Sequence, residues 1–298
     1  MPAISLGTAF IDPEQVASVV EDALRAGYRH FDTAWLYKSE AGVGQAIRNS
    51  GVPRSELFIT TKLWNTFHRP EDVKKGLEES LANLGLDYVD MYLMHGPLSV
   101  DNPPGIARDG PTTPTPYEGI PDCDPQIDVI DTYRAMEKLL ETGKVKAIGV
   151  SNFSVDRLER LLANTSIIPA VNQVELHPYL PQPKLVEYCQ SKGIALTAYA
   201  PLGSIIKDHL REDPVVVEVA KSCNVTSAQV LLGWGLKRGY GVIPKSKTKE
   251  RIIENFHPVD LTDEDFAKIS AITYRERFIN PGDFIGKAYT GAFGFEEA

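Results

Sequence analysis

The sequence has few cysteines, and their spacing argues against two common kinds of stabilising site. Three occur in 298 residues, at Cys123, Cys189 and Cys223. An odd number of widely spaced cysteines does not match a disulfide framework or the ligand spacing of a zinc site. We therefore expect no disulfide framework and no metal centre, and the cysteine usage is most simply explained by location in a reducing compartment.

Long apolar runs are missing as well. No segment has the roughly eighteen uncharged apolar residues that a membrane-spanning helix needs. The start, residues 1–5, has neither the basic region nor the apolar run of a signal peptide. Together with the cysteine usage, these absences predict a cytoplasmic protein without a membrane partner.

Positive charge is in the minority. There are 31 Lys and Arg residues against 40 Asp and Glu residues, a net charge of -9. This balance disfavours nucleic acid or an anionic membrane surface as a general partner. Residues 244–251 oppose the trend with a basic run, which in isolation is typical of a solvated helix end. No exposed apolar stripe stands out, so we expect a monomer.

Eight strand-like runs rich in Val, Ile, Leu and aromatic residues alternate with segments of helical periodicity. This alternation is the pattern of βα units around a parallel sheet, and eight is the number that closes a barrel. The predicted fold class is therefore α/β, a single (β/α)8 TIM barrel over residues 1–298, because barrels reach this length with one core. The runs cover residues 4–8, 30–33, 57–63, 88–95, 147–151, 170–175, 195–200 and 241–245.

Helix starts and stops also have local signals. Proline in the first turn with acids beside it predicts helix N-termini at 12–14 and 69–72. Gly85 supplies a stop for the second of these helices. Ser154 and Thr226 are capping residues that open two more helices.

Residues 96–126 interrupt the alternation. They contain eight prolines with Gly, Thr and Asp and little apolar periodicity, and they follow His95 directly. Such a segment predicts a long functional loop over the C-terminal face of the barrel. The alternative is an inert insertion, since loops accept extra length cheaply. The tail 276–298, rich in Gly and aromatic residues, is expected to flank the active site as a second flap.

Four residues stand at or just beyond the ends of predicted strands: Asp32, Tyr37, Lys62 and His95. A barrel of alternating strands and helices concentrates its chemistry at the carboxyl ends of its strands, so these residues meet there. A phenol, an ammonium, a carboxylate and an imidazole in one cleft predict proton transfer to a carbonyl oxygen.

Three segments carry a family resemblance. They are LRAGYRHFDTAWLYKSE at 24–40, MEKLLETGKVKAIGVSNF at 136–153 and IPKSKTKERIIEN at 243–255. In this order and at these strand ends they resemble the three signatures of the aldo-keto reductase family, and the likeness covers nearly the whole chain. The overall plan is most similar to the fungal sugar and aldehyde reductases, of the xylose reductase type.

The resemblance implies a catalytic tetrad. A free phenol titrates near pH 10, so Tyr37 needs a neighbour that stabilises phenolate if it is to act as a general acid. Lys62 is implied as that cation, and Asp32 as the carboxylate that keeps the ammonium charged and in place. His95 is implied to orient and polarise the carbonyl oxygen of the substrate.

The hydride must come from a cofactor, because no side chain donates one. No Gly-x-Gly-x-x-Gly follows a strand, so a Rossmann crevice is not indicated. The resemblance implies instead that the barrel itself binds an extended nicotinamide dinucleotide. It assigns the carboxamide to Ser151, Asn152 and Gln173, and the stack on the nicotinamide ring to Tyr199.

The basic run gains a role from the same resemblance. Lys245, Ser246 and Arg251 match positions that hold the adenosine 2′-phosphate, where cations stabilise a dianion. NADPH is therefore favoured over NADH, although some sugar reductases of the family accept both. The remaining implied cofactor contacts are Leu202 and Ser204 at the pyrophosphate, and Glu254 and Asn255 at the adenine.

The substrate site is expected to include Trp64 and His95. Small residues at Ala9 and Gly96, where relatives often carry aromatic side chains, favour a wider pocket. Such a pocket suits an aldose, a uronate or a small aldehyde, and equally a bulkier ketone.

The predicted function is NADPH-dependent reduction of such a carbonyl compound to the alcohol, by an oxidoreductase acting on CH-OH groups. The alternative is a cofactor-binding regulatory or structural homologue with little turnover. A barrel hydrolase is disfavoured, because the sequence has no Gly-x-Ser-x-Gly motif and no cluster of metal ligands.

Overall fold

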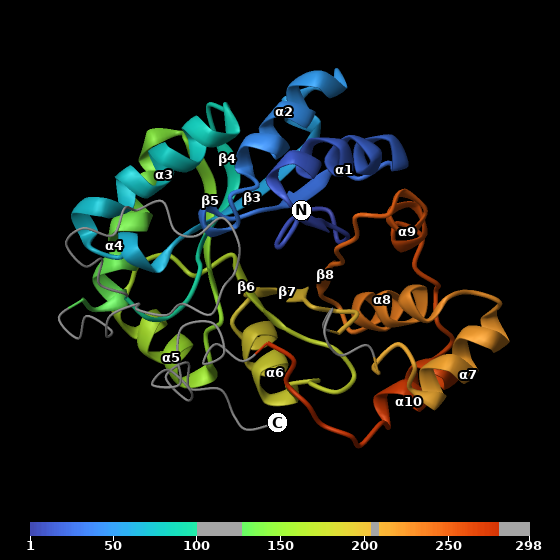
Figure 1. Ribbon diagram of the computed structural model, residues 1–298. Helices are drawn as coiled ribbons and strands as arrows, with labels where there is room; N and C mark the ends of the chain where they lie inside the picture. The colour runs from blue at the N-terminus through green and yellow to red at the C-terminus, as the bar shows by residue number, and fades with distance from the viewer. Residues whose placement is uncertain (100–126, 204–208, 280–298) are drawn as a thin grey trace, which may run out of the picture.

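The computed structural model describes residues 1–99, 127–203 and 209–279. Eight parallel strands form one sheet in the order β1 to β8, and helices surround it (Figure 1). The predicted TIM barrel is confirmed, and one observed strand corresponds to each predicted run. The strands are β1 Leu6–Gly7, β2 His30–Asp32, β3 Phe58–Leu63, β4 Val89–Met94, β5 Val145–Ser151, β6 Val171–Glu175, β7 Ala195–Tyr199 and β8 Gly241–Ile243.

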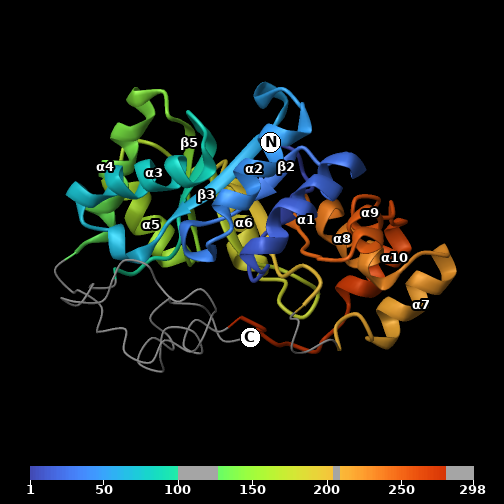
Figure 2. The ribbon, with the colours of Figure 1, turned by 45° about the horizontal axis from the view of Figure 1, so that its top comes forward.

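The helices pack around the outside of the strands. In Figures 1 and 2, α3 to α5 lie on one side of the barrel and α7 to α10 on the other. The α-helices are α1 Pro13–Ala26, α2 Glu40–Ser50, α3 Pro70–Leu84, α4 Val129–Leu139, α5 Val155–Asn164, α6 Pro183–Ser191, α7 Pro214–Cys223, α8 Ser227–Lys237, α9 Lys249–Asn255 and α10 Asp263–Ser270. Short 3₁₀ turns are η1 Trp35–Tyr37, η2 Arg54–Glu56, η3 Asn65–Phe67 and η4 Leu140–Thr142.

Hydrogen bonds between the first and last strands close the barrel. Ile4 forms a parallel bridge with Val242. Ser5 N donates to Val242 O at 3.0 Å, and Gly7 N donates to Pro244 O at 2.9 Å. The backbone N–H and C=O groups along the outer edges of these two strands are thereby paired. In an open sheet they would lack partners within the sheet.

Side chains alternate between the inside and the outside of the barrel. On β3, Lys62 reaches the carboxylate of Asp32 across the interior, whereas the neighbouring Thr61 donates to Glu40 of α2 on the outside. This period of two follows from the pleat of a strand. It explains how one short strand supplies both a buried functional group and a helix contact.

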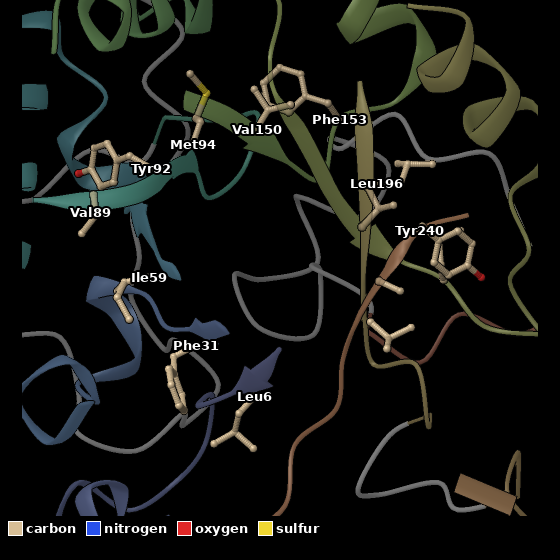
Figure 3. Close-up of a cluster of buried hydrophobic side chains, with 14 of the residues drawn as sticks. Leu6, Phe31, Ile59, Val89, Tyr92, Met94, Val150, Phe153, Leu196 and Tyr240 are labelled. Carbon is tan, nitrogen blue, oxygen red and sulfur yellow. The ribbon is translucent and has the colours of Figure 1, made fainter. Parts of the chain in front are cut away.

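The larger part of the core lies between the strands and the helices. Figure 3 shows side chains of this cluster from strands spread around the barrel, including Leu6, Phe31, Ile59 and Leu196. A smaller apolar group, formed by Met91, Leu93 and Val171, is separate from it.

Helix boundaries follow the local signals in the sequence. α1 and α3 begin with Pro13 and Pro70, and α3 stops at Gly85, whose φ of 61° is left-handed. Thr226 closes a capping box with Gln229 at the start of α8. These expectations are confirmed, whereas Ser154 stands at the N-cap of α5 as predicted but its side chain forms no capping hydrogen bond with the described residues.

Two expectations fall largely outside the described residues. Of the predicted loop 96–126, residues 100–126 lie there, and so do residues 280–298 of the predicted tail.

In the described part of the chain, no single helix combines the length and apolar character needed to cross a membrane, although α7 and α8, bent by 95°, meet the criterion as a pair.

A close helix contact generates a stability prediction. A Cβ at Gly44 of α2 would lie 1.7 Å from the carbonyl oxygen of Leu84, which also accepts a hydrogen bond from Arg48. Gly44→Ala should therefore lower the free energy of unfolding by about 1–3 kcal/mol through overpacking, although alanine is the better helix former. Urea unfolding measures this. The exposed neighbour Gln45→Ala should stay within about 0.5 kcal/mol of the wild type, and an equal effect of both changes would contradict the packing argument.

Candidate active site

A buried ion pair lies at the centre of the candidate site. β2 ends at Asp32 and β3 carries Lys62, whose Nζ donates to Asp32 Oδ1 at 2.5 Å and to the carbonyl oxygen of Thr33 at 2.9 Å. The Lys62 side chain is fully buried and that of Asp32 is 4% exposed. Two charges this deep in a protein are tolerated only because each neutralises the other and is hydrogen-bonded.

The second oxygen of Asp32 binds a residue from the far side of the barrel. Gln173 of β6 donates from Nε2 to Asp32 Oδ2 at 2.7 Å. Ser151, the last residue of β5, donates its hydroxyl to the backbone oxygen of Gln173 at 2.9 Å. The carboxylate of Asp32 on β2 thus connects β3 with β6, and Ser151 joins the end of β5 to this network through Gln173.

Tyr37 reaches the site from a short turn after β2. The turn η1 ends with Lys38 in a left-handed conformation, φ 55°, and Trp35 anchors it by donating from Nε1 to Glu79 Oε2 of α3 at 3.0 Å. The Lys62 ammonium lies 5.0 Å from the centroid of the Tyr37 ring. A cation at this distance is placed to stabilise negative charge on the phenol.

His95 follows β4 and faces Tyr37. Its Nε2 lies 3.4 Å from Tyr37 OH, and the two rings meet edge to face. Its backbone is held on both sides, because its N donates to Leu63 O and its carbonyl oxygen accepts from Asn152 Nδ2, each at 3.0 Å. Trp64 packs its ring 5.2 Å from the imidazole. The four predicted catalytic residues and Trp64 are therefore brought together at one end of the strands.

Burial sets the protonation of these groups. It raises the pKa of Tyr37, and the charge of Asp32 raises it further, so the phenol carries its proton at neutral pH. Burial lowers the pKa of His95 well below its usual value, and the charge of Lys62 adds to this, so the imidazole is neutral. Burial also lowers the pKa of Lys62, against which Asp32 acts by charge and by hydrogen bond.

The predicted nicotinamide contacts adjoin this group. Tyr199 ends β7, and its OH donates to Asn152 Oδ1 at 2.8 Å. Asn152 adopts a left-handed conformation, φ 65°, that turns its amide toward Ser151, whose Oγ accepts from Nδ2 at 3.2 Å. Leu202 follows in the loop after β7, and the predicted contact Ser204 lies outside the described residues. Ser151, Asn152 and Tyr199 therefore form one hydrogen-bonded set.

The predicted phosphate contacts lie after β8. Burial lowers the pKa of Lys245 to about 8, and the nearby charge of Lys247 contributes. Ser246 is buried and accepts from Thr248 N at 3.0 Å, and Arg251 is exposed at the start of α9. Neither Lys245 nor Arg251 forms an ion pair with a carboxylate in the described ranges, whereas Lys247 binds Asp12 Oδ2 at 2.7 Å. Two cations that have no carboxylate counter-ion among the described residues fit an anionic ligand.

The two predicted adenine contacts differ in their surroundings. Asn255 is buried, and its Oδ1 has no hydrogen-bond partner among the described residues. Buried polar atoms are normally paired, so this oxygen is suited to a ligand donor such as an amino group. Glu254 already accepts from Thr226 Oγ1 at 2.7 Å.

Several contacts of the site were not predicted. The carbonyl oxygen of Thr33 as an acceptor for Lys62 and the amide of Gln173 on Asp32 depend on the closed barrel. Glu175, fully buried at the end of β6, was not singled out. A signal for it exists, because it stands two residues after Gln173 and so shares its face of the strand.

Comparison with known proteins agrees with this arrangement. A model of the aldo/keto reductase family matches residues 3–273. The chain is 46% identical to a glycerol 2-dehydrogenase (NADP(+)) of Saccharomyces cerevisiae over 92% of this chain and 88% of that protein. It is 41% identical to an NADPH-dependent D-xylose reductase of Meyerozyma guilliermondii over 95% of each chain. A crystal structure of a Bombyx mori aldo-keto reductase in complex with NADP superposes with a TM-score of 0.83 at 36% identity, covering 95% of this chain and 92% of that one.

The buried ion pair yields a stability prediction. Lys62→Met leaves the Asp32 carboxylate buried without its cation and should lower the free energy of unfolding by about 3–5 kcal/mol. Adding Asp32→Asn removes the stranded charge, so the double variant should recover part of this loss. Urea unfolding of the two single variants and the double variant tests the coupling. The exposed Lys74→Met should change stability by less than about 0.5 kcal/mol. Additive losses in the double variant would contradict the pairing.

Proposed function

The chain belongs to the aldo/keto reductase family, and from this premise we propose that it reduces an aldehyde or ketone to the alcohol with NADPH. The observation that carries the proposal is the assembly of Tyr37, Lys62, Asp32 and His95 at one end of the strands. It provides a proton donor, a cation beside that donor and a neutral imidazole facing it. Such a set can polarise the carbonyl oxygen of a substrate and protonate it as hydride arrives.

The cofactor residues are proposed from the fit of their chemistry. NADPH, when bound, supplies the hydride that the carbonyl carbon receives. Ser151, Asn152 and Gln173 would hold the carboxamide, and Tyr199 would stack on the nicotinamide ring. The remaining proposed contacts are Leu202 and Ser204 at the pyrophosphate, Lys245, Ser246 and Arg251 at the 2′-phosphate, and Glu254 and Asn255 at the adenine.

In the proposed mechanism, His95 and Tyr37 position the carbonyl oxygen between them. The neutral imidazole, with its proton on Nε2, donates to that oxygen. As negative charge develops there, Tyr37 transfers its phenol proton to it. Lys62, held by Asp32, stabilises the phenolate that remains.

In this proposal the side-chain amide of Gln173 binds both Asp32 and the carboxamide of the cofactor. Its Nε2 donates to Asp32, while its Oε1 accepts no hydrogen bond from the described residues and suits the amide group of a carboxamide. The same residue therefore contacts the tetrad and faces the proposed nicotinamide site. This arrangement favours a cofactor ring held close to the proton donor.

For the substrate we propose a polar aldehyde, such as an aldose, a uronate or a small aldehyde, with a bulkier ketone as the second candidate. Trp64 supplies an apolar wall beside His95. Ala9 and Gly96 carry small or no side chains at the ends of β1 and β4. A panel of these compounds, followed by NADPH absorbance, would rank them by kcat/KM. The single-domain organisation, the monomeric state and the cytoplasmic location stay predictions.

Removal of the proton donor tests the mechanism. Tyr37→Phe should lower kcat by about 10²–10⁴-fold, because general acid catalysis contributes that much, while NADPH binding is unchanged. Steady-state kinetics and quenching of protein fluorescence by NADPH measure the two effects. Tyr188→Phe, on α6 and away from the site, is the matched control. Full turnover of Tyr37→Phe would refute the assignment, and NADPH binding by the wild type without turnover of any panel compound would favour the binding-protein alternative.

The pKa of Lys245 predicts a pH-dependent cofactor preference. With a pKa of about 8 in the free protein, the ammonium is charged below that pH and neutral above it. A phosphate binds the charged form, so NADPH affinity should fall about twofold between pH 7 and pH 8 and about tenfold by pH 9. NADH carries no 2′-phosphate, and its affinity should stay flat.

Titration of both cofactors at pH 7, 8 and 9 by fluorescence measures this preference. Lys245→Arg should remove the pH dependence, because arginine stays charged over the whole range. An NADPH affinity independent of pH in the wild type, or equal kcat/KM for NADPH and NADH at pH 7, would contradict the proposed phosphate site.

A further inference from the structure

Glu175 is a buried carboxylate that the proposed mechanism does not use. It is the last residue of β6, fully buried, and paired in register with Tyr199 of β7. Its Oε1 accepts from Phe278 N at 2.6 Å and from His177 Nε2 at 2.8 Å, and its Oε2 accepts from Ile279 N at 3.0 Å. A carboxylate with three such donors is a strong anchor, because hydrogen bonds to a charged acceptor are stronger than neutral ones.

The anchored segment comes from the far end of the chain. After α10 the backbone runs back toward β6 and α6, as the red trace in Figures 1 and 2 shows. Arg277 lies 3.9 Å from Glu175 Oε2, and Glu276 N donates to Tyr179 O at 3.1 Å. Residues 276–279, the anchored segment, are thus held by the carboxylate at one end and by the loop after β6 at the other.

The anchored segment also contacts the connection between β7 and α7 on both sides of residues 204–208. The Phe278 ring lies against Gly203, since a Cβ there would be 3.2 Å from Phe278 Cε2. On the other side, Glu276 Oε2 accepts from His209 Nε2 at 2.6 Å. Tyr179, which binds the anchored segment, donates to Asp213 at the start of α7 at 2.8 Å.

The contacted residues adjoin the proposed cofactor site. Gly203 follows Leu202, a proposed pyrophosphate contact, and Tyr199 is the proposed platform for the nicotinamide ring. Glu175 also acts on Tyr199 through space: burial is the main cause that raises the pKa of the Tyr199 phenol, and the charge of Glu175 adds to it. One buried charge therefore neighbours both parts of the proposed cofactor surface.

We propose that Glu175 is a positioning residue for the cofactor. Its carboxylate fixes the anchored segment, and the Phe278 ring in that segment packs against Gly203, the residue after the proposed pyrophosphate contact Leu202. Glu175 is fully buried and its oxygens accept from the anchored segment and from His177, so in this proposal it acts through Phe278. The inference rests on the proposed function, because it needs NADPH to lie beside Tyr199 and Leu202.

The physical reason is the rigidity that a charged anchor gives to backbone amides. Without it, the backbone N–H groups of Phe278 and Ile279 lose their charged acceptor, and the anchored segment keeps its other contacts, among them those of Glu276 and of the Phe278 ring. If Phe278 holds Gly203 and the neighbouring Leu202 less firmly, binding of NADPH must also order this backbone, and the entropy cost of that ordering weakens binding. The loss should appear in the dissociation rate, where most affinity differences within one site occur.

Glu175→Gln tests the proposal. The amide keeps the shape but can accept with one oxygen only, and its NH₂ opposes a backbone N–H. The dissociation rate of NADPH, measured by stopped-flow fluorescence with a trapping ligand, should rise about tenfold, the effect of losing one charged hydrogen bond. The single-turnover rate of reduction at saturating NADPH should be unchanged, so KM for NADPH rises while the chemical step does not.

Phe278→Ala distinguishes positioning from a general loss of structure. It keeps the backbone N–H that binds Glu175 but removes the ring from Gly203, and it should also speed NADPH dissociation. In this background Glu175→Gln should add little, because both changes act through the same contact. Independent, multiplying effects of the two changes would overturn the proposal. Glu187→Gln, exposed on α6, is the matched control and should leave dissociation unchanged.

The outcomes separate this inference from the function on which it rests. If wild-type protein does not bind NADPH, the proposed function fails. If it binds NADPH and Glu175→Gln releases it at the wild-type rate, the positioning role alone fails. Circular dichroism and thermal unfolding check that each variant is folded, and if Glu175→Gln does not fold, an unchanged dissociation rate in Phe278→Ala overturns the proposal by itself.

Discussion

The ion pair between Asp32 and Lys62 is the interaction on which the rest of the site depends. Each charge is stable in the barrel only because the other is there, and each fixes further groups. Lys62 holds its ammonium near the Tyr37 ring, and Asp32 receives the amide of Gln173 from the opposite side. The pair therefore determines where the proton donor and the proposed carboxamide contact lie relative to each other. Burial, which makes the pair costly to disturb, also keeps the phenol of Tyr37 protonated and the imidazole of His95 neutral.

Much of the fold could be predicted from the sequence because its signals are local. Apolar β-rich runs, Pro70 in a first turn and Gly85 after the last turn of a helix need no knowledge of distant residues. The meeting of Asp32, Tyr37, Lys62 and His95 could be predicted too, because each follows or ends a strand of a parallel barrel. The signatures around them supplied the roles, and the family comparison confirms the membership that they indicated.

Other contacts of the site could not be predicted, because they join residues that only the closed barrel brings together. Gln173 was assigned to the carboxamide, and its second contact with Asp32 crosses the barrel interior over 141 positions of sequence. Glu175 binds the backbone amides of Phe278 and Ile279, which no side-chain pattern reveals. Nearly every residue has a backbone N–H, so the sequence does not indicate which of them a carboxylate will bind.

Closure of the barrel through its two ends has a consequence for how the chain is made. The bridge between Ile4 and Val242 joins residues 238 positions apart, so one edge of the first strand stays unpaired until nearly the whole polypeptide has left the ribosome. Contacts of such large sequence separation form late and slow the folding of a domain. The residues that follow β8 include Lys245 and Arg251, the cations proposed for the 2′-phosphate. A nascent or truncated chain that lacks β8 would therefore be both unclosed and without those cations, so loading of the cofactor would coincide with completion of the barrel.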